Sequence, residues 1–291
     1  MRVTAEFGPG LLAAVIHTPT GERLPLGPGA LDKLLQEEAP VELALLPRRL
    51  TMARRVLHLL PTTALPQPLL PFHTLALDFA RALAAAPKNR VLLVSDCQLF
   101  EGLSAPALAP ALPPRLAQLA GSLPGGDSLL HEAALDDAEA RTGRTLSISF
   151  DHPFSVAAFL EGRPVYCSGG FSGVEHFPSP QASGCFDPGL LFLPPQPPPD
   201  PDVQGASVPW LVHHLALQSG RAITAMGGLD RIVAGAADEA QARRFFDLMT
   251  PALHLKEHGL ASPTARFHTF DLHGTLAALL APGADAPRRP R

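Results

Sequence analysis

The order of expected secondary-structure elements is the same in two long stretches of the chain, and this duplication is the strongest constraint on the fold. In the first stretch, which starts at Arg2, three strands are followed by a helix, a strand, a helix and a further strand. The second stretch starts near Thr145 and repeats that order. Helices that alternate with strands in this way pack on the faces of a sheet, and 291 residues exceed the usual size of one core. The sequence therefore predicts an α/β protein with two similar halves.

Hydrophobic patterns place the elements of the first copy. Arg90–Ser95 is a short apolar run, which is typical of a strand buried on both faces. In Phe72–Ala86, apolar residues recur at four-residue spacing and predict a helix. The prolines of residues 61–72 exclude a regular element there. The other elements expected in this copy are strands at Arg2–Phe7, Leu12–Thr18, Arg23–Leu26 and Val41–Leu46 and a helix at Ala30–Glu38.

Turn and cap signals divide the rest of the chain. Glu161-Gly162 separates two apolar runs and predicts a hairpin turn. Gly227-Gly228 predicts the end of a long helix, and Asp127 is placed to cap the start of another. The expected elements are helices at Pro114–Leu119, Ser128–Thr142, Trp210–Met226, Glu239–Leu253 and Leu272–Leu280, and strands at Thr145–Phe150, Ser155–Glu161, Pro164–Ser168 and Arg231–Ala234.

Charge and composition exclude several classes of protein. The net charge is −4, and Lys and Arg do not cluster with aromatic residues, so we expect no nucleic-acid partner. No stretch approaches the roughly 18 apolar residues of a membrane span, and the N-terminus does not resemble a signal peptide. Cys97, Cys167 and Cys185 lack the spacing of a metal site and are expected to be reduced thiols. We therefore expect a cytoplasmic protein without a membrane partner.

Three segments of the second copy carry a resemblance to a known family. Ser155–Tyr166 resembles the hairpin of acetate and butyrate kinases, in which a strand that reads S-V-A-A leads to a turn and a second strand. Glu175–Gly189 is similar to their stretch E-G-P-F-S-P-E-R-S-G, and Ala225–Val233 resembles the helix end and strand before their adenosine loop T-G-G-I. The chain is therefore identified as a divergent member of the acetate/butyrate kinase family, within the sugar kinase, heat-shock chaperone and actin superfamily.

The first copy resembles the same family more weakly. Arg55–His58 is similar to the acetate kinase motif H-R-V-V-H, and Leu129–His131 resembles the family's F-H-G-T-S-H. Val94–Cys97 places an aspartate at the end of a buried strand, as these kinases do. Together the segments cover most of the chain in the order of the family.

The resemblance implies two ribonuclease H-like α/β domains with a central cleft. It assigns residues 1–144 to an N-terminal domain and residues 145–269 to a C-terminal domain. A helix at about 270–281 is expected to pack back on the N-terminal domain, and residues 282–291 are expected to form a disordered tail. The resemblance also implies a homodimer that forms through the C-terminal domain.

The same alignment implies the position of a site. Asp96, Arg55 and His131 stand where the family has its catalytic aspartate, arginine and histidine. Each also has a structural explanation: a capping carboxylate, a solvated surface arginine and a packing histidine. The residues that align with the cofactor-binding loops are Gly8, Gly10, Asp151, Ser183, Gly184 and Gly235.

Spacing predicts no metal site. His213 and His214 are neighbours on an expected helix, where adjacent side chains point about 100° apart and cannot share a metal. Asp271 and His273 could chelate a cation weakly, but no third ligand is spaced to complete the site.

The loops that hold phosphate in the family are altered here. The strand-end motif N-A-G-S-S-S aligns with Phe7–Leu12, so an asparagine has become phenylalanine and hydroxyls have become leucine. In the hairpin motif H-L-G-G-G, Asp151 adds a negative charge and Pro153 lacks an amide donor. The arginine of R-S-G aligns with Ala182, and T-G-G-I aligns with Ala234–Ala237. Phosphoryl transfer depends on such donors and charges, so we expect poor use of ATP.

Three functions remain open from the sequence. The first is a non-catalytic protein with a binding or regulatory role, which needs no cofactor. The second is an active ATP-dependent carboxylate kinase that uses ATP and Mg²⁺ through rebuilt phosphate contacts. The third is a different activity in the same cleft, for instance hydrolysis. The expected ligand is a small carboxylate or another metabolite.

Overall fold

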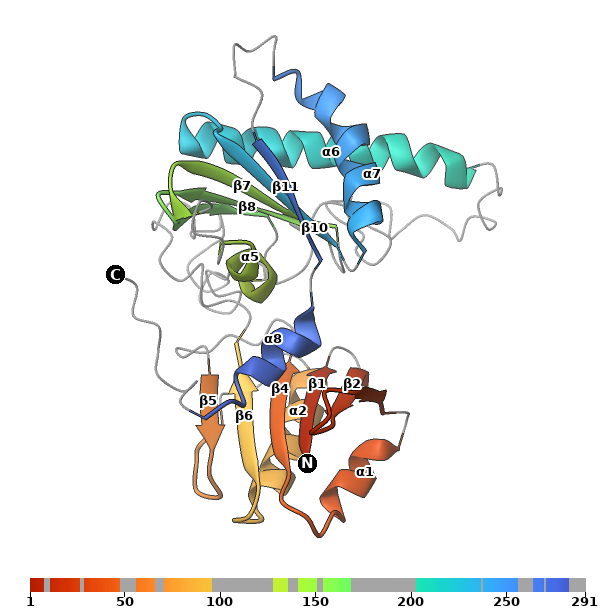
Figure 1. The fold of residues 1–291 in the computed structure, drawn as a ribbon, viewed down its shortest axis with the longest axis vertical. Coiled ribbons are helices and arrows are strands. Elements are labelled where there is room, and N and C mark those ends of the chain that lie inside the picture. The colour runs from red at the N-terminus through yellow and green to blue at the C-terminus, as the bar shows by residue number, and fades with distance from the viewer. Residues whose placement is uncertain are drawn as a thin grey trace. The chain divides into compact units, whose positions relative to one another are not determined.

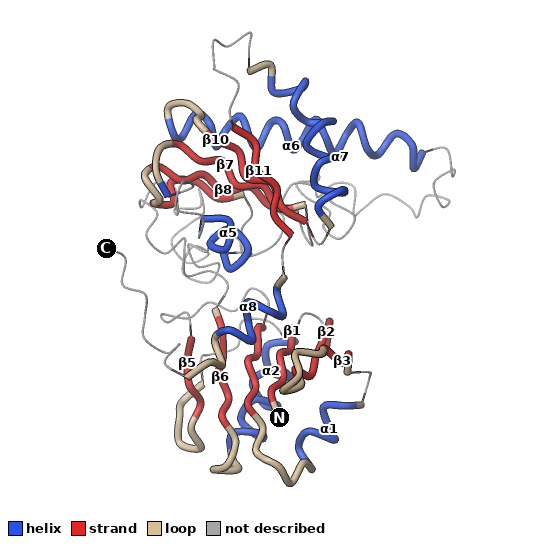
Figure 2. Tube along the Cα trace, in the orientation of Figure 1, coloured by secondary structure: helices blue, strands red, loops and turns tan. Residues whose placement is uncertain are grey.

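The computed structural model divides the chain into two compact units, each with its own sheet (Figures 1 and 2). Met1–Gln98 and Asp271–Arg291 form the first unit, and Leu99–Phe270 form the second. None of the described helices is long and apolar enough to cross a membrane. The structure describes residues 1–7, 11–26, 29–47, 56–65, 71–95, 128–135, 141–150, 154–168, 203–236, 238–255, 264–269 and 271–282.

The sheet of the first unit combines antiparallel and parallel pairing, in the order β3-β2-β1-β4-β6-β5. The first three strands form an antiparallel meander, β4 and β6 continue the sheet parallel to β1, and β5 pairs antiparallel with β6 at the edge. Their bounds are β1 Arg2–Phe7, β2 Leu11–His17, β3 Arg23–Pro25, β4 Glu42–Pro47, β5 Val56–Leu59 and β6 Arg90–Val94; the helices of this unit are α1 Ala30–Leu35, α2 Pro71–Ala84 and α8 Leu272–Ala278.

Helices cover both faces of this sheet (Figure 1). Side chains such as Val3 and Leu43 point to one face, where they form a core with Ala80 and Leu83 of α2. The alternate positions point to the other face, where Thr4 contacts α8. Because both faces are covered, the central strands are apolar along most of their length, as expected for parallel strands.

The second unit has a mixed sheet in the order β11-β10-β7-β8-β9. Strands β7 to β9 form an antiparallel meander, while β10 and β11 run parallel to β7. Helices α6 and α7 pack on one face, and α5 packs on the other. The bounds are β7 Arg144–Ser149, β8 Ser155–Leu160, β9 Arg163–Cys167, β10 Arg231–Ala236, β11 Thr264–Thr269, α5 Ser128–Leu135, α6 Val203–Met226, α7 Glu239–Met249 and a 3₁₀ turn, Thr250–Leu253.

The two sheets share one topology, and the predicted duplication is confirmed at this level. The run β3-β2-β1-β4-β6 in one unit corresponds to β9-β8-β7-β10-β11 in the other, and β5 is an addition to the first. The predicted turn at Glu161-Gly162 is also confirmed, with φ of 51° and 71°. At the end of α6, the amide of Gly228 donates to the carbonyl of Ile223 with φ of 143° at the glycine, so the predicted helix end is confirmed as well.

Some predicted elements differ from those observed. Strand β5, which is four residues long, was not expected. The repeated order implies a last strand in the second copy, but no residue range was predicted for it; it is β11, which alternates polar and apolar residues at a sheet edge. Strand β10 continues to Ala236, two residues beyond its predicted end. The predicted helix Pro114–Leu119 lies outside the described residues. Helix α5 contacts β7 and so lies with the second sheet, although the sequence analysis placed it before the boundary at residue 144; that boundary stays a prediction.

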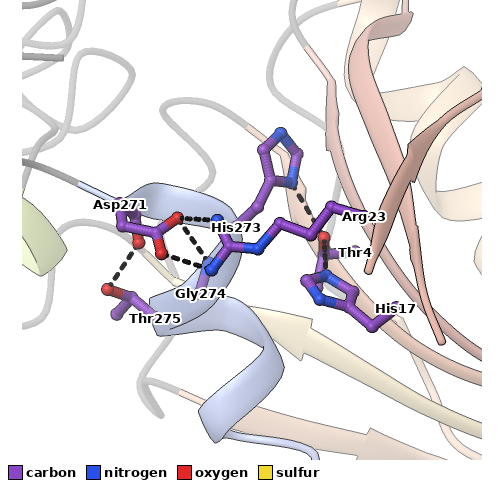
Figure 3. A network of polar contacts seen from close by, with 7 residues as sticks. All are labelled: Thr4, His17, Arg23, Asp271, His273, Gly274 and Thr275. Atoms are coloured by element: carbon purple, nitrogen blue, oxygen red, sulfur yellow. Dashed lines mark hydrogen bonds and ion pairs between the residues drawn. The ribbon is translucent and has the colours of Figure 1, made fainter. Parts of the chain in front are cut away.

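The docking of α8 on the first sheet joins residues from opposite ends of the chain (Figure 3). The guanidinium of Arg23 donates two hydrogen bonds to the carboxylate of Asp271, one of them 2.6 Å long. The same carboxylate accepts from the amide of Gly274 at 2.9 Å and so caps the start of α8. Leu276 and Leu280 are fully buried, and Arg90 donates to the carbonyl of Leu280 at 2.8 Å.

We predict that Asp271→Ala lowers the protection of α8 against hydrogen exchange by about 1–2 kcal/mol, because the helix loses its cap. Asp271→Asn should lower the protection of α8 by less than half of that amount. Asparagine can also cap a helix, and an exposed ion pair contributes little to stability. The measurement is hydrogen exchange of a peptide that covers residues 271–282. As a control, Glu239→Gln removes an exposed ion pair in α7 and should leave α8 unchanged. Equal losses in both Asp271 variants would show that the charge, and not the cap, holds the helix.

Candidate functional site

In each unit the parallel strands end at a common edge of the sheet, and this edge is where open α/β sheets bind ligands. In the first unit the edge is reached by Phe7 at the end of β1 and by Ser95, which follows β6. Two of the predicted site residues, Gly8 and Asp96, are the next residues in sequence. The predicted site residues Gly8, Gly10, Arg55, Asp96, Asp151, Ser183 and Gly184 lie outside the described residues, so their roles stay predictions.

The end of β1 carries an apolar side chain that belongs to the core. Phe7 is 4% exposed and stacks on Phe79 of α2, with ring centroids 6.1 Å apart. This is the position where the resemblance implies an asparagine in the related kinases. The side chain at the end of β1 is therefore part of the packing between β1 and α2.

At the corresponding edge of the second unit, residues from neighbouring strands lie side by side. His268 of β11 pairs in register with Gly235 of β10, and Gly235 pairs with Ser149 of β7. Ser149 in turn pairs with Ser155 of β8. The predicted site residue Gly235 is thus described inside a strand, and its neighbours Ala234 and Ala236 are buried in the hydrophobic core.

The predicted site residue His131 lies on α5 and is fully buried. Its Nδ1 is 2.8 Å from the hydroxyl of Ser147, and its Nε2 is 3.0 Å from the hydroxyl of Ser155. Burial lowers the pKa of His131 to about 3, so the ring is neutral at neutral pH. Both ring nitrogens already have hydroxyl partners, and the hydrogen bonds join α5 to two strands. A catalytic role for this histidine stays a prediction.

A layer of buried hydroxyl groups lies between α5 and the sheet. Alternate residues of β7 are polar and point toward α5, and all of them are fully buried. The sequence T-L-S-I-S shows this alternation, but the same pattern usually marks a strand with one face in water. For that reason the alternation alone does not indicate that these hydroxyl groups are buried. The members of the layer are Ser128, Thr145, Ser147, Ser149 and Ser155.

His268 was not predicted as a site residue, because no residue range was predicted for strand β11. Among the described residues, its Nε2 is the one buried side-chain nitrogen or oxygen without a hydrogen-bond partner. Burial, and secondarily the charge of Arg266, lower the pKa of His268. The ring is therefore neutral at neutral pH.

A third polar cluster lies in the first unit (Figure 3). The hydroxyl of Thr4 is 2.8 Å from Nδ1 of His273 and 2.9 Å from Nε2 of His17. A hydroxyl can donate to one ring and accept from the other, so the two neutral rings have opposite roles. The carboxylate of Asp271 is engaged by Arg23, and Nδ1 of His273 is engaged by Thr4. No group of three metal-ligating side chains is present among the described residues.

Comparison with known proteins shows the fold. No family model and no curated protein sequence matches the chain. The structure is similar to an acetate kinase from Porphyromonas gingivalis, with a TM-score of 0.59, 15% identity and coverage of 96% of this chain and 98% of that chain. It is also similar to a propionate kinase from Francisella tularensis, with a TM-score of 0.63, 12% identity and coverage of 95% of this chain and 97% of that chain. For an acetate kinase from Entamoeba histolytica the TM-score is 0.58, the identity is 12%, and the coverage is 88% of this chain and 87% of that chain. The chain therefore has an acetate kinase-like α/β fold.

We predict that His131 makes the stability of the second unit depend on pH. The unfolded chain takes up a proton near the ordinary pKa of 6.5, whereas the folded chain does so only near 3. This contribution is therefore complete above pH 6.5 and is lost as the pH falls toward 3, with a slope of up to about 1.4 kcal/mol per pH unit.

Urea unfolding between pH 4 and pH 7.5 measures this effect. In His131→Gln the slope should be smaller, and stability at neutral pH should fall by about 1–3 kcal/mol because hydrogen bonds to buried hydroxyls are lost. The control His213→Gln changes an exposed histidine and should keep the original slope. An unchanged slope in His131→Gln would contradict the prediction.

Proposed function

We propose that the chain is a binding protein with an acetate kinase-like fold that has lost efficient phosphoryl transfer. The proposal rests on the burial of Phe7 in the core at the end of β1. Contacts to phosphate at this position would need a polar side chain. An anion placed against such a side chain loses its hydration without gaining a donor, which costs several kcal/mol.

One further feature of the described residues supports a loss of Mg²⁺–ATP binding. Strand β10 keeps its pairing through Gly235 and Ala236, so these residues are part of a sheet and not of an open loop with free amides. We therefore derive no catalytic step through this cofactor.

An active carboxylate kinase is the second candidate. The observation in its favour is the similarity to acetate and propionate kinases over nearly the whole length of both chains. In this alternative, Asp96 and Arg55 would supply the charged groups, with ATP, Mg²⁺ and a small carboxylate as ligands. The two candidates differ in whether ATP is bound and consumed.

We predict that the protein shows no saturable binding of Mg²⁺–ATP in calorimetry. It should also form no acyl phosphate with acetate or butyrate when the product is trapped as a hydroxamate. The acetate kinase from Porphyromonas gingivalis, assayed in parallel, shows that the conditions permit turnover. Binding at micromolar ATP together with formation of acyl phosphate would overturn the proposal and support the active kinase.

We further predict that Phe7→Asn lowers the stability of the first unit by about 3–5 kcal/mol, because it removes a buried aromatic ring and buries an amide. Phe7→Leu keeps most of the apolar volume and should cost clearly less. Urea unfolding of both variants gives the comparison. If Phe7→Asn were as stable as the parent protein and bound ATP, Phe7 would be part of a ligand site and not of the core.

A further inference from the structure

Strand β11 contains a feature that the packing of the described residues does not explain. A buried polar atom in a folded protein nearly always has a partner, and an exception needs an explanation such as a bound water, an ion or a ligand. The Nε2 atom of His268 is such an exception among the described residues. In contrast, both ring nitrogens of the buried His131 have hydroxyl partners in the same unit.

The face of the sheet on which His268 lies follows from the alternation of side chains. Phe267 packs against Phe246 of α7, with ring centroids 5.3 Å apart, so His268 points to the opposite face. On β10 the same face carries Gly235, the register partner of His268. Glycine in a strand often marks a place where a ligand approaches the backbone closely.

The charge on this face favours a negatively charged ligand. On β7, β10 and β11 the positions that share the face are Arg231, Arg266, His268, Gly235, a valine and several hydroxyl residues, with no carboxylate among them. Arg231 donates to the carbonyl of Thr142 and lies 3.4 Å from the hydroxyl of Thr145. Of these two arginines, Arg266 acts on the His268 ring, since its charge contributes to the lowered pKa of His268. A positive charge near the ring favours an anion there.

We propose that His268 donates a hydrogen bond from Nε2 to an oxyanion, a carboxylate or a phosphate group, that lies against Gly235 at the carboxyl end of β10. The inference rests on the proposed function in treating the chain as a binding protein, and it adds a position for the ligand, its chemical class and the residue that recognises it. The neutral ring can carry its proton on Nε2 and so satisfy the atom that lacks a partner.

The test uses the full chain with ¹⁵N-labelled histidine and follows the ring signals at pH 7. Sodium phosphate and sodium acetate are added separately, and sodium chloride is the control for ionic strength. We expect a saturable shift of the His268 signal, with a dissociation constant in the millimolar range or below. A response to phosphate alone assigns a phosphate ligand, a response to acetate alone assigns a carboxylate, and a response to both supports general oxyanion recognition.

Substitutions separate recognition from a structural role. The apparent affinity for the anion is obtained from the rise in melting temperature with anion concentration. His268→Ala should lower this affinity about tenfold, which is the loss expected for one hydrogen bond to a charged group. His268→Gln places an amide nitrogen near the position of Nε2 and should retain part of the binding. Gly235→Ala keeps the donor but adds a methyl group next to it, so it should also weaken binding. His58→Gln changes an exposed histidine of the first unit and should have no effect.

Two results would overturn the inference. One is a His268 signal that neither anion shifts, which would leave a buried water as the partner of Nε2. The other is a His268→Ala variant that folds and binds both anions as tightly as the parent protein. Turnover of ATP would refute the proposed function without removing the anion site, so the two failures can be told apart.

Discussion

The parallel pairing of β1 with β4, and of β7 with β10, is the constraint on which the rest of each unit depends. Parallel neighbours cannot be joined by a hairpin, so the chain must cross over the sheet between them, and helices then cover its faces. This buries both faces of the central strands and brings the carboxyl ends of all parallel strands to one edge. The hydrophobic cores and the candidate site therefore follow from the same pairing.

The sequence predicts the elements whose burial is continuous and misses those at the margins. Arg90–Val94 could be predicted as a buried strand because all of its residues after Arg90 are apolar. The residues of β11 could not be predicted as a strand in the same way, because β11 lies at an edge of the sheet and is only partly buried. Register was the second limit. Nothing local in the sequence shows that Ser147 and Ser155 meet His131, because the two serines come from different strands and the histidine from a helix.

His131 and His268, which both lie in the second unit, show why burial alone does not indicate function. The neutral ring of His131 is stable in the interior because each nitrogen has a hydroxyl partner, and a satisfied polar network of this kind fixes the position of a helix. His268 has the same neutral charge but one nitrogen without a partner. The cost of such an atom is recovered only when something binds to it, so the unsatisfied ring is the better indicator of a site.

Phe7 shows that the end of a parallel strand can serve the hydrophobic core instead of a ligand. A residue at the end of a parallel strand can face either a ligand or the helix behind the sheet. The first environment favours a polar side chain, and the second favours an apolar one. A polar group suits the ligand but weakens the core, whereas a phenylalanine stacked on Phe79 strengthens the core and removes the polar contact. Because each sheet is held by its backbone pairing and its apolar faces, such an exchange leaves the topology intact. Similarity of fold to acetate kinases is therefore compatible with a changed activity.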